Sequence, residues 1–227
     1  MEAVLQLCTI PGVTLRRDAA RNRDKLIEAA QAVFAEQGLD VPLDAVADRA
    51  CVGIATLYRR FPTRDSLIAA AFEDRMAEYV RVAQEALDDP DPWAGFTGFV
   101  EHICDMQAAD RGTGDVFTRT LPAAPVLEEQ RELGYGYVVR LIERAKVAGR
   151  LRADVTPEDL PLLLMANAGV VEATGEAAPA ASRRFVALML EAFRADGTGE
   201  LAPPIEPRDM YRALRRAGRR RRAAPSA

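Results

Sequence analysis

Apolar residues recur at helical spacing from Arg21 to Leu87, and the repeat is interrupted at only three places. The interruptions are Gly38, the Cys-Val-Gly triplet at 51–53, and Pro62. Apolar side chains at i, i+3, i+4 and i+7 form one stripe on each segment, so each segment buries one face against its neighbours. Because glycine and proline end helices, we expect three helices followed by a fourth, long one.

The rest of the chain repeats the helical pattern after a break at the sequence DDPDP. We expect five further helices, near residues 93–109, 115–120, 125–148, 157–172 and 182–195. No run alternates with the period of two that marks a strand, and only 6% of the residues are aromatic. The chain is therefore predicted to be all-α, with a tri-helical N-terminal unit and a larger helical domain after it.

The third short helix has two unlike sides. At about 100° per residue, Leu57 and Phe61 share one arc. Thr56, Arg59 and Arg60 lie on the opposite arc. In a helix-turn-helix unit, the third helix presents its outer side to the major groove of DNA. We expect Arg59 to read a guanine edge through two hydrogen bonds, because it lies nearest the centre of the exposed arc.

The net charge of -4 hides an uneven distribution. Residues 1–65 carry nine basic and nine acidic side chains, residues 66–207 carry 13 and 24, and residues 208–227 carry eight and one. A local basic cluster can grip phosphate even on an acidic protein. The arginines at 16–23 are either a DNA-contacting arm or an ordinary solvated helix start. The arginines at 208–222 either add nonspecific DNA affinity or only increase solubility.

One run of residues carries a family resemblance, GIATLYRRFPTRDSLIAAAF at 53–72. It resembles the DNA-binding region of the TetR family of bacterial transcriptional regulators, in which the recognition helix ends in T-L-Y-x-H-F and a long fourth helix follows. Residues 148–164, AGRLRADVTPEDLPLLL, resemble the start of the penultimate helix of many members. Two positions depart from the family pattern, because Cys51 stands where glycine is usual and Arg60 replaces the common histidine.

The resemblance implies an all-helical homodimer with an N-terminal DNA reader and a C-terminal domain for an unknown small-molecule effector. It divides the chain into a flexible arm at 1–18, a DNA-binding domain at 19–78 with its reader motif at 42–61, a ligand-binding and dimerisation domain at 79–200, and a disordered Arg-rich tail at 201–227. The resemblance also implies which residues contact DNA. By motif position these are Ile54, Ala55, Thr56, Tyr58, Arg59, Arg60 and Arg64. We add Arg21 from the basic start of the first helix.

An effector cavity in the second half is one of two interpretations of an apolar helix. Phe99, His102 and Met106 share a stripe of this helix, whose apolar side covers more than half of its circumference. Such a helix either packs in a bundle core or lines a cavity together with Phe117 and Asn167. If Asn167 is buried, it needs a hydrogen-bonding partner from a ligand, a backbone carbonyl or a second subunit.

Dimerisation is expected, by family analogy, through the helices at 157–172 and 182–195, paired as an intersubunit four-helix bundle. Two readers related by a two-fold axis would recognise a palindromic operator. An effector would act only by binding two conformations of the dimer unequally. The chain is thus expected to be a ligand-responsive repressor, with an architectural DNA-binding protein that has no effector as the alternative.

An enzyme is the alternative from another class. A di-iron helical bundle needs two E-x-x-H pairs, whereas His102 is the single histidine and has no acid three residues before it. The motifs GxxxxGK[ST], GxSxG and GxGxxG do not occur. Cys8, Cys51 and Cys104 have no C-x-x-C spacing and indicate reduced thiols in a cytoplasmic, nucleoid-associated protein. We expect no cofactor, metal site, catalytic residue, signal peptide or membrane span.

Overall fold

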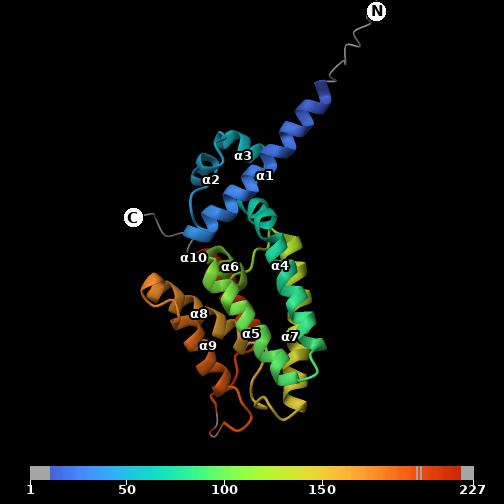
Figure 1. Cartoon of the computed structure of the whole chain (residues 1–227), viewed down its shortest axis with the longest axis vertical. Coiled ribbons are helices and arrows are strands. Elements are labelled where there is room, and N and C mark those ends of the chain that lie inside the picture. Colours follow the sequence, from blue (N-terminus) through green and yellow to red (C-terminus); the bar gives the residue numbers. More distant parts are fainter. Residues whose placement is uncertain (1–10, 198, 200, 221–227) are drawn as a thin grey trace, which may run out of the picture.

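The computed structural model describes residues 11–197, 199 and 201–220, with side chains from residue 22 onward except at 176 and 217–220. These residues form ten α-helices and one short 3-10 helix, and they contain no strand beyond an isolated bridge between Leu151 and Arg194. The all-α prediction is therefore confirmed (Figure 1). The helices are α1 (Pro11–Gln37), α2 (Leu43–Arg49), α3 (Ile54–Arg60), α4 (Arg64–Asp88), α5 (Pro92–Ala109), α6 (Arg111–Thr118), α7 (Pro125–Val147), α8 (Asp159–Thr174), α9 (Ala181–Ala192) and α10 (Pro207–Arg220), with the 3-10 helix at Gly175–Ala177.

The first three helices pack together at one end of an elongated molecule, and α4 runs from them into the larger helical body (Figure 1). The apolar stripes expected from the sequence are the buried faces of these helices. Burying such a face supplies most of the stability of short helices, which are marginal in isolation. The buried stripe residues are Leu26, Ala30, Val33 and Phe34 on α1, Leu43, Val46 and Ala47 on α2, Leu57 on α3, and Leu67, Ile68, Ala71 and Phe72 on α4.

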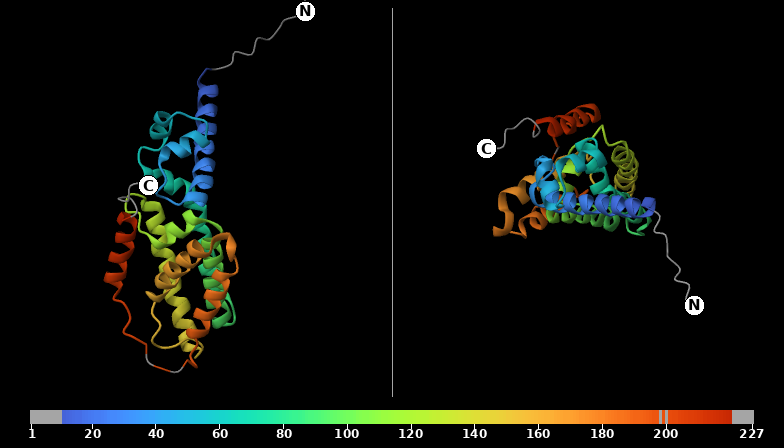
Figure 2. Two further views of the ribbon diagram at one scale, coloured as in Figure 1. Left: turned by 90° about the vertical axis from the view of Figure 1, so that its left-hand side faces the viewer. Right: turned by 90° about the horizontal axis from the view of Figure 1, so that it is seen from above.

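The larger body is a helical bundle built around α4. This helix packs along α7 and against α5, while α8 and α9 pair with each other and also pack on α5. After α9 the chain turns at the end far from α1, and α10 returns alongside the body (Figure 2). None of the helices in the described ranges is both long and apolar enough to cross a membrane.

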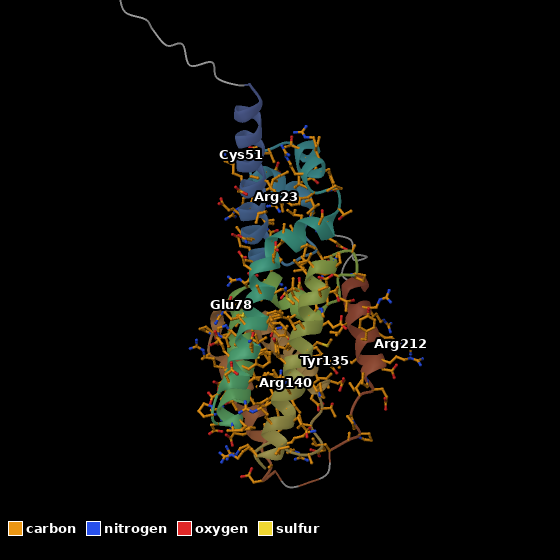
Figure 3. The ribbon with its side chains drawn as sticks, turned by 90° about the vertical axis from the view of Figure 1, so that its right-hand side faces the viewer. Arg23, Cys51, Glu78, Tyr135, Arg140 and Arg212 are labelled. Carbon is orange, nitrogen blue, oxygen red and sulfur yellow. The ribbon has the colours of Figure 1, made fainter. Side chains whose placement is uncertain are left out.

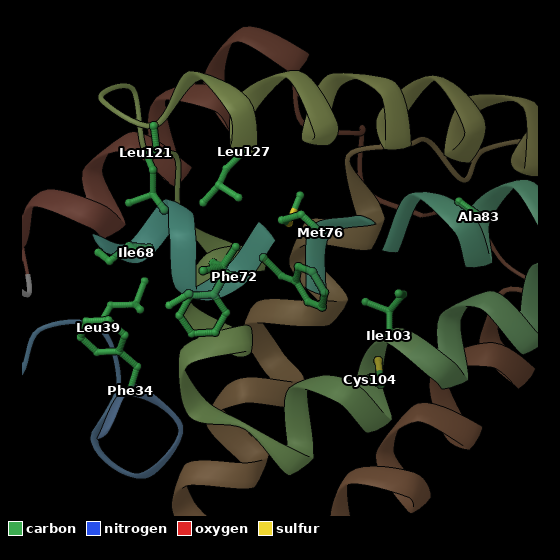
Figure 4. Packing of buried hydrophobic residues seen from close by; sticks show 14 of the residues in the cluster. Phe34, Leu39, Ile68, Phe72, Met76, Ala83, Ile103, Cys104, Leu121 and Leu127 are labelled. Carbon is green, nitrogen blue, oxygen red and sulfur yellow. The ribbon is translucent and has the colours of Figure 1, made fainter. Parts of the chain in front are cut away.

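One continuous core joins the two parts of the chain, and α6 is packed into it (Figure 4). The rings of Phe34 and Phe72 stack with centroids 6.2 Å apart and planes at 27°. Gly112 of α6 lies against both, because a Cβ at this position would overlap the Phe72 ring and lie 3.0 Å from the Phe34 carbonyl oxygen. The first turn of α6 therefore requires glycine for its close approach to α1 and α4.

Two helices begin earlier than the sequence pattern predicts. Helix α1 begins at Pro11, so residues 11–18 of the expected flexible arm are helical, while residues 1–10 lie outside the described residues. Proline suits the first turn of a helix, where its missing N–H has no intrahelical role. Helix α6 begins at Arg111 rather than near residue 115, because the Asp110 side chain caps it by accepting a 3.0 Å hydrogen bond from Thr113 N.

The segment expected to be a disordered tail contains helix α10, which corrects that prediction over residues 207–220. Met210 is 5% exposed, and Leu214, one turn later, lines a cavity of the helical body. This i, i+4 apolar pair is enough to dock one side of the helix. The high arginine content of this segment favoured a solvated tail in the sequence analysis. Arg212, on the outer side of α10, points to solvent (Figure 3).

Candidate nucleic-acid interface and effector cavity

The turn between α2 and α3 holds Cys51 in a conformation that favours glycine. Its φ is +53°, in the left-handed region, and its side chain is exposed (Figure 3). The N–H of Cys51 donates to the Asp48 carbonyl, and the N–H of Val52 donates to the Ala47 carbonyl, each at 3.0 Å. These two bonds form a Schellman C-cap, in which glycine normally occupies the position of Cys51. The turn thus keeps the usual geometry at the cost of backbone strain.

Replacing Cys51 with glycine is expected to raise the free energy of unfolding by about 0.5 to 1 kcal/mol. The left-handed conformation costs a residue with a Cβ about 1–2 kcal/mol, and the extra freedom of glycine in the unfolded chain offsets part of this gain. Urea denaturation of the full chain would measure the difference. Cys51→Ser is the matched control, because it keeps the Cβ and should leave stability unchanged. Equal stability of the glycine and serine variants would contradict strain at this turn.

Helix α3 exposes most of the side chains expected to contact DNA. Its seven residues span about 10 Å at 1.5 Å per residue, and Leu57 is fully buried beneath it. Arg59 and Arg60 are exposed at its C-terminal end and form no ion pair with any described residue. Both cations are therefore available to a polyanion. Of the remaining side chains, Ala55 is exposed, Tyr58 is 48% exposed, and Ile54 and Thr56 are half-buried.

Arg64 has a different set of contacts from the other expected DNA-binding residues. Its Nη1 donates to the carbonyls of Leu39 at 2.9 Å and Val41 at 2.7 Å. It therefore holds the loop between α1 and α2 on the first turn of α4. That turn is itself fixed by a reciprocal capping box between Thr63 and Ser66. Arg21 lies on α1, but its side chain is outside the described residues.

A buried ionic cluster joins α6 to the same loop. Arg119 lies between two carboxylates, with Nη2 2.5 Å from Asp115 Oδ1 and Nη1 2.8 Å from Asp40 Oδ2. Asp115 Oδ2 accepts a 2.9 Å hydrogen bond from Leu39 N. Gly38, at φ +79°, leaves room for that carboxylate, since a Cβ there would lie 2.8 Å from Asp115 Oδ2. We refer to Asp40, Asp115 and Arg119 as the junction cluster.

A mainly apolar cavity of about 110 Å³ lies between α4, α5, α7 and α8. Phe99 and Phe117, two of the expected effector residues, line this cavity, and both are largely buried. The structure brings these two together from α5 and α6. The polar lining residues are Tyr79, Arg131 and Tyr135, and α10 contributes Leu214.

A larger hollow of about 710 Å³ lies between α5, α6, α8 and the start of α9. Asn167 is buried beside it, with an exposed fraction of 0%, and is not among the lining residues of either cavity. Its Nδ2 donates to Gln107 Oε1 at 2.8 Å, and its Oδ1 accepts from Ser182 Oγ at 2.8 Å. The partner that a buried Asn167 needs is therefore supplied by side chains of α5 and α9.

His102 and Met106 do not join Phe99 at the apolar cavity, which corrects the expected set. The His102 side chain is 41% exposed, and its Nε2 lies 3.2 Å from Glu78 Oε1 on α4. Met106 packs against the core seven residues, or about 10 Å, along the helix from Phe99. Neither His102 nor Met106 is among the residues that line this cavity. Helical spacing predicts that residues lie on the same side of a helix. It does not predict that they reach the same cavity along the length of that helix.

Comparison with known protein families assigns both parts of the chain. A sequence model of bacterial regulatory proteins of the tetR family matches residues 26–71. A second model, for the C-terminal domain of SbtR-like transcriptional regulators, matches residues 91–195. The chain belongs to the TetR family of transcriptional regulators. The first match covers α2 and α3, and the second covers α5 to α9. The apolar cavity is lined in addition by α4 and α10, which lie outside the second match.

Relatives of this TetR-family chain include the transcriptional repressor KstR of Mycobacterium tuberculosis, which is 34% identical over 99 residues. That alignment covers 43% of this chain and 43% of KstR. The TetR transcriptional regulator SCO0520 of Streptomyces coelicolor is 30% identical, with 77% of this chain and 99% of SCO0520 covered and a TM-score of 0.49. FadR of Bacillus subtilis, solved in complex with stearoyl-CoA, has a TM-score of 0.53 at 14% identity, covering 75% of this chain and 98% of FadR, and so shares the fold.

Sequence reasoning missed several residues of the TetR-family chain that the structure brings to these sites. Asp115 and Arg119 have the i, i+4 spacing of a helical ion pair, which could have indicated their contact. Asp40 has no such signal, because it is 79 residues from Arg119 in the chain. Tyr79 and Arg131 have no sequence feature that points to a cavity.

Proposed function

We propose that this TetR-family regulator is a ligand-responsive repressor that binds a palindromic operator as a homodimer. Its DNA-binding domain is proposed to span residues 19–78, and its effector-binding and dimerisation domain residues 79–200. Family membership supports the general role in transcription. The finer proposals are supported by the exposed side of α3, by the outer faces of α8 and α9, and by the cavity between α4, α5, α7 and α8.

The exposed side of α3 is the observation that carries the proposal. Arg59 and Arg60 extend from a helix that is anchored by Leu57, and no described acid neutralises either of them. Arginine can donate two hydrogen bonds to a guanine edge, while Tyr58 can donate to a phosphate. We propose that α3 enters the major groove, with Arg59 as the base-reading residue and Arg60 as a phosphate or base contact.

The dimer interface is proposed on α8 and α9. Leu162 on α8 is 40% exposed and Leu188 on α9 is 53% exposed. Phe185 and Met189 on α9 are only partly buried. A second copy of the same pair of helices would cover these side chains in a four-helix bundle.

Two helices link the apolar cavity to the DNA-binding domain. On α4, Tyr79 lines the cavity and Arg64 holds the loop after α1. On α6, Phe117 lines the cavity and Asp115 holds the same loop, together with Arg119, the residue that directly follows this helix. An effector that prefers one position of these helices would change the spacing of the two readers in the dimer.

Footprinting of the full chain on fragments of its own genome tests the proposed function. A homodimeric regulator should protect one or a few palindromes near promoters, with half-sites about one helical turn or more apart. Leu188→Glu places a charge in the proposed interface and should convert a dimer to a monomer in the ultracentrifuge and weaken protection by about tenfold or more. Val147→Glu is the matched control, since Val147 is 81% exposed at the end of α7, outside the proposed interface.

Three results would count against this proposal. Protection of many unrelated sites would favour an architectural DNA-binding protein. A wild-type chain that sediments as a monomer would exclude the dimer. Equal behaviour of the Leu188→Glu and Val147→Glu variants would exclude α8 and α9 as the interface.

A further inference from the structure

The apolar cavity has room for one ring. Its volume is about 110 Å³, and an engineered apolar cavity of about 150 Å³ in another protein is known to bind benzene. Most of its lining is aliphatic or aromatic, from Met76, Val100, Ile103, Val138, Leu160 and Leu163 among others.

Aromatic side chains form one wall of the cavity. The Tyr79 ring lies 5.8 Å from the Phe99 ring and 5.5 Å from the Phe117 ring, with interplanar angles of 53° and 44°. Tilted rings at these distances are the geometry in which aromatic groups attract one another. Gly134 of α7 leaves room for the Tyr79 ring, because a Cβ at this position would overlap it. A bound aromatic ring can extend this cluster.

The Tyr79 hydroxyl has no hydrogen-bonding partner among the described residues. Burial raises the pKa of Tyr79 to about 12, with a smaller opposing effect of the nearby Arg131 guanidinium. The phenol therefore remains protonated at neutral pH and can donate its proton. The Tyr79 oxygen is not among the fully buried polar atoms that lack a partner, so it is accessible and can donate a hydrogen bond to a ligand oxygen.

Arg131 provides a second unused donor at the same cavity. Its Nη atoms donate to the carbonyls of Val116, Phe117 and Arg119. Its Nε is buried without a hydrogen bond, 3.5 Å from Glu128 Oε2. The Glu128 carboxylate compensates the charge of the guanidinium, so the cavity offers donors without an excess positive charge. A neutral acceptor suits it better than an anion.

From these contacts we propose that the cavity binds a compact, uncharged aromatic molecule with one oxygen substituent, which accepts a hydrogen bond from Tyr79. This inference rests on the proposed function and specifies the effector class of that site. The ring fills the space between Phe99, Phe117 and the aliphatic lining. The oxygen substituent lies toward the Tyr79 hydroxyl and Arg131 Nε. Leu214 of α10 borders the same space.

Tyr135 supplies a matched control for Tyr79. It lines the same cavity, but its hydroxyl already donates to Glu158 Oε1 at 3.0 Å. Figure 3 shows Tyr135 on α7, with α10 beside that helix. Removing the Tyr135 hydroxyl therefore removes a bond within the protein and leaves the proposed ligand bond intact. Both Tyr→Phe changes retain the ring and its packing.

The test is ligand-observed NMR on the full chain, with phenol, toluene, benzoate and decanoate as probes. Phenol should bind wild-type protein more tightly than benzoate or decanoate. Tyr79→Phe should weaken phenol binding by about three- to tenfold, the effect of one net hydrogen bond, and leave toluene binding unchanged. Tyr135→Phe, which removes only the bond to Glu158, should weaken phenol binding by less than Tyr79→Phe does.

The inference is overturned if phenol does not bind, if benzoate or decanoate binds more tightly, or if Tyr79→Phe leaves phenol binding unchanged. Release of a footprinted DNA fragment is measured separately, so that the two proposals can fail independently. Phenol that binds through Tyr79 without releasing DNA would support the ligand class and contradict the switch. DNA release by decanoate without phenol binding would support the switch and contradict the ligand class.

Discussion

Replacing Arg119 with methionine is expected to lower the free energy of unfolding of the full chain by about 3 to 5 kcal/mol. The Arg119 side chain is 5% exposed and lies between Asp115 and Asp40, whose side chains are 11% and 25% exposed. Methionine removes the cation but leaves both carboxylates in a region that water reaches poorly. Breaking a buried ion pair costs more than the pair itself contributes, because the remaining charges lose their compensation.

Arg183→Met is the control for this prediction. Arg183 on α9 forms a 3.2 Å ion pair with Asp105 on α5, but the two side chains are 79% and 54% exposed. An exposed pair of this kind contributes about 0 to 1 kcal/mol, so urea denaturation should detect little change. Similar losses for the two variants would show that burial does not distinguish the junction cluster. A small loss for Arg119→Met would mean that α6 does not depend on this cluster.

Local pattern was sufficient to predict the helices of the DNA-binding region. The breaks at Gly38 and Pro62 lie beside helix ends, and Thr63, directly after Pro62, caps α4. Each of these signals acts within a few residues of the chain, through backbone conformation or a capping hydrogen bond. Cys51 is an exception. The sequence shows that it stands where glycine is usual, but does not show which backbone conformation the turn adopts. The structure shows that the turn keeps its left-handed residue in spite of the side chain.

Helical periodicity could not predict contacts between residues that are far apart in the chain. Arg64 stays a predicted DNA contact because of its place in the family motif, but the sequence does not show that its guanidinium donates to carbonyls 23 and 25 residues away. The cavity shows the same limit. Phe99 and Phe117 were expected there and are found there, but Tyr79 and Arg131 come from other helices, and only the packing of the bundle brings the four together.

The start of α6 and the presence of α10 illustrate how tertiary contacts override local composition. Glycine at position 112 is unfavourable in a helix by about 1 kcal/mol relative to alanine, yet only glycine allows α6 to approach Phe72. The arginines of α10 suggest a solvated tail, yet Met210 and Leu214 are enough to dock one side. In both cases a few tertiary contacts outweighed the structural preference that the composition of the segment indicates.

Replacing Arg59 with alanine is expected to weaken operator binding by about 1 to 3 kcal/mol per half-site, or about 2 to 6 kcal/mol for a dimer on two half-sites. Arg59 is exposed near the end of α3 and has no described acidic partner, so alanine should not disturb the fold. The loss should be confined to specific DNA, with sequence preference relaxed at one base pair in each half-site. Fluorescence anisotropy with the footprinted operator and with single-base variants would measure this at fixed salt.

Two variants separate base reading from general attraction to phosphate. Arg49→Ala removes another exposed arginine of the same region, but Arg49 is paired with Glu36 at 3.0 Å and should affect affinity by less than about 0.5 kcal/mol. Tyr58→Phe should weaken binding to all sequences by a similar factor, because the proposed partner of its hydroxyl is a phosphate, which carries no sequence information. If Arg59→Ala lowers affinity equally for every sequence, as Tyr58→Phe is expected to do, Arg59 contacts only the backbone. Base reading would then have to come from other exposed residues of α3, with Arg60 as the first candidate.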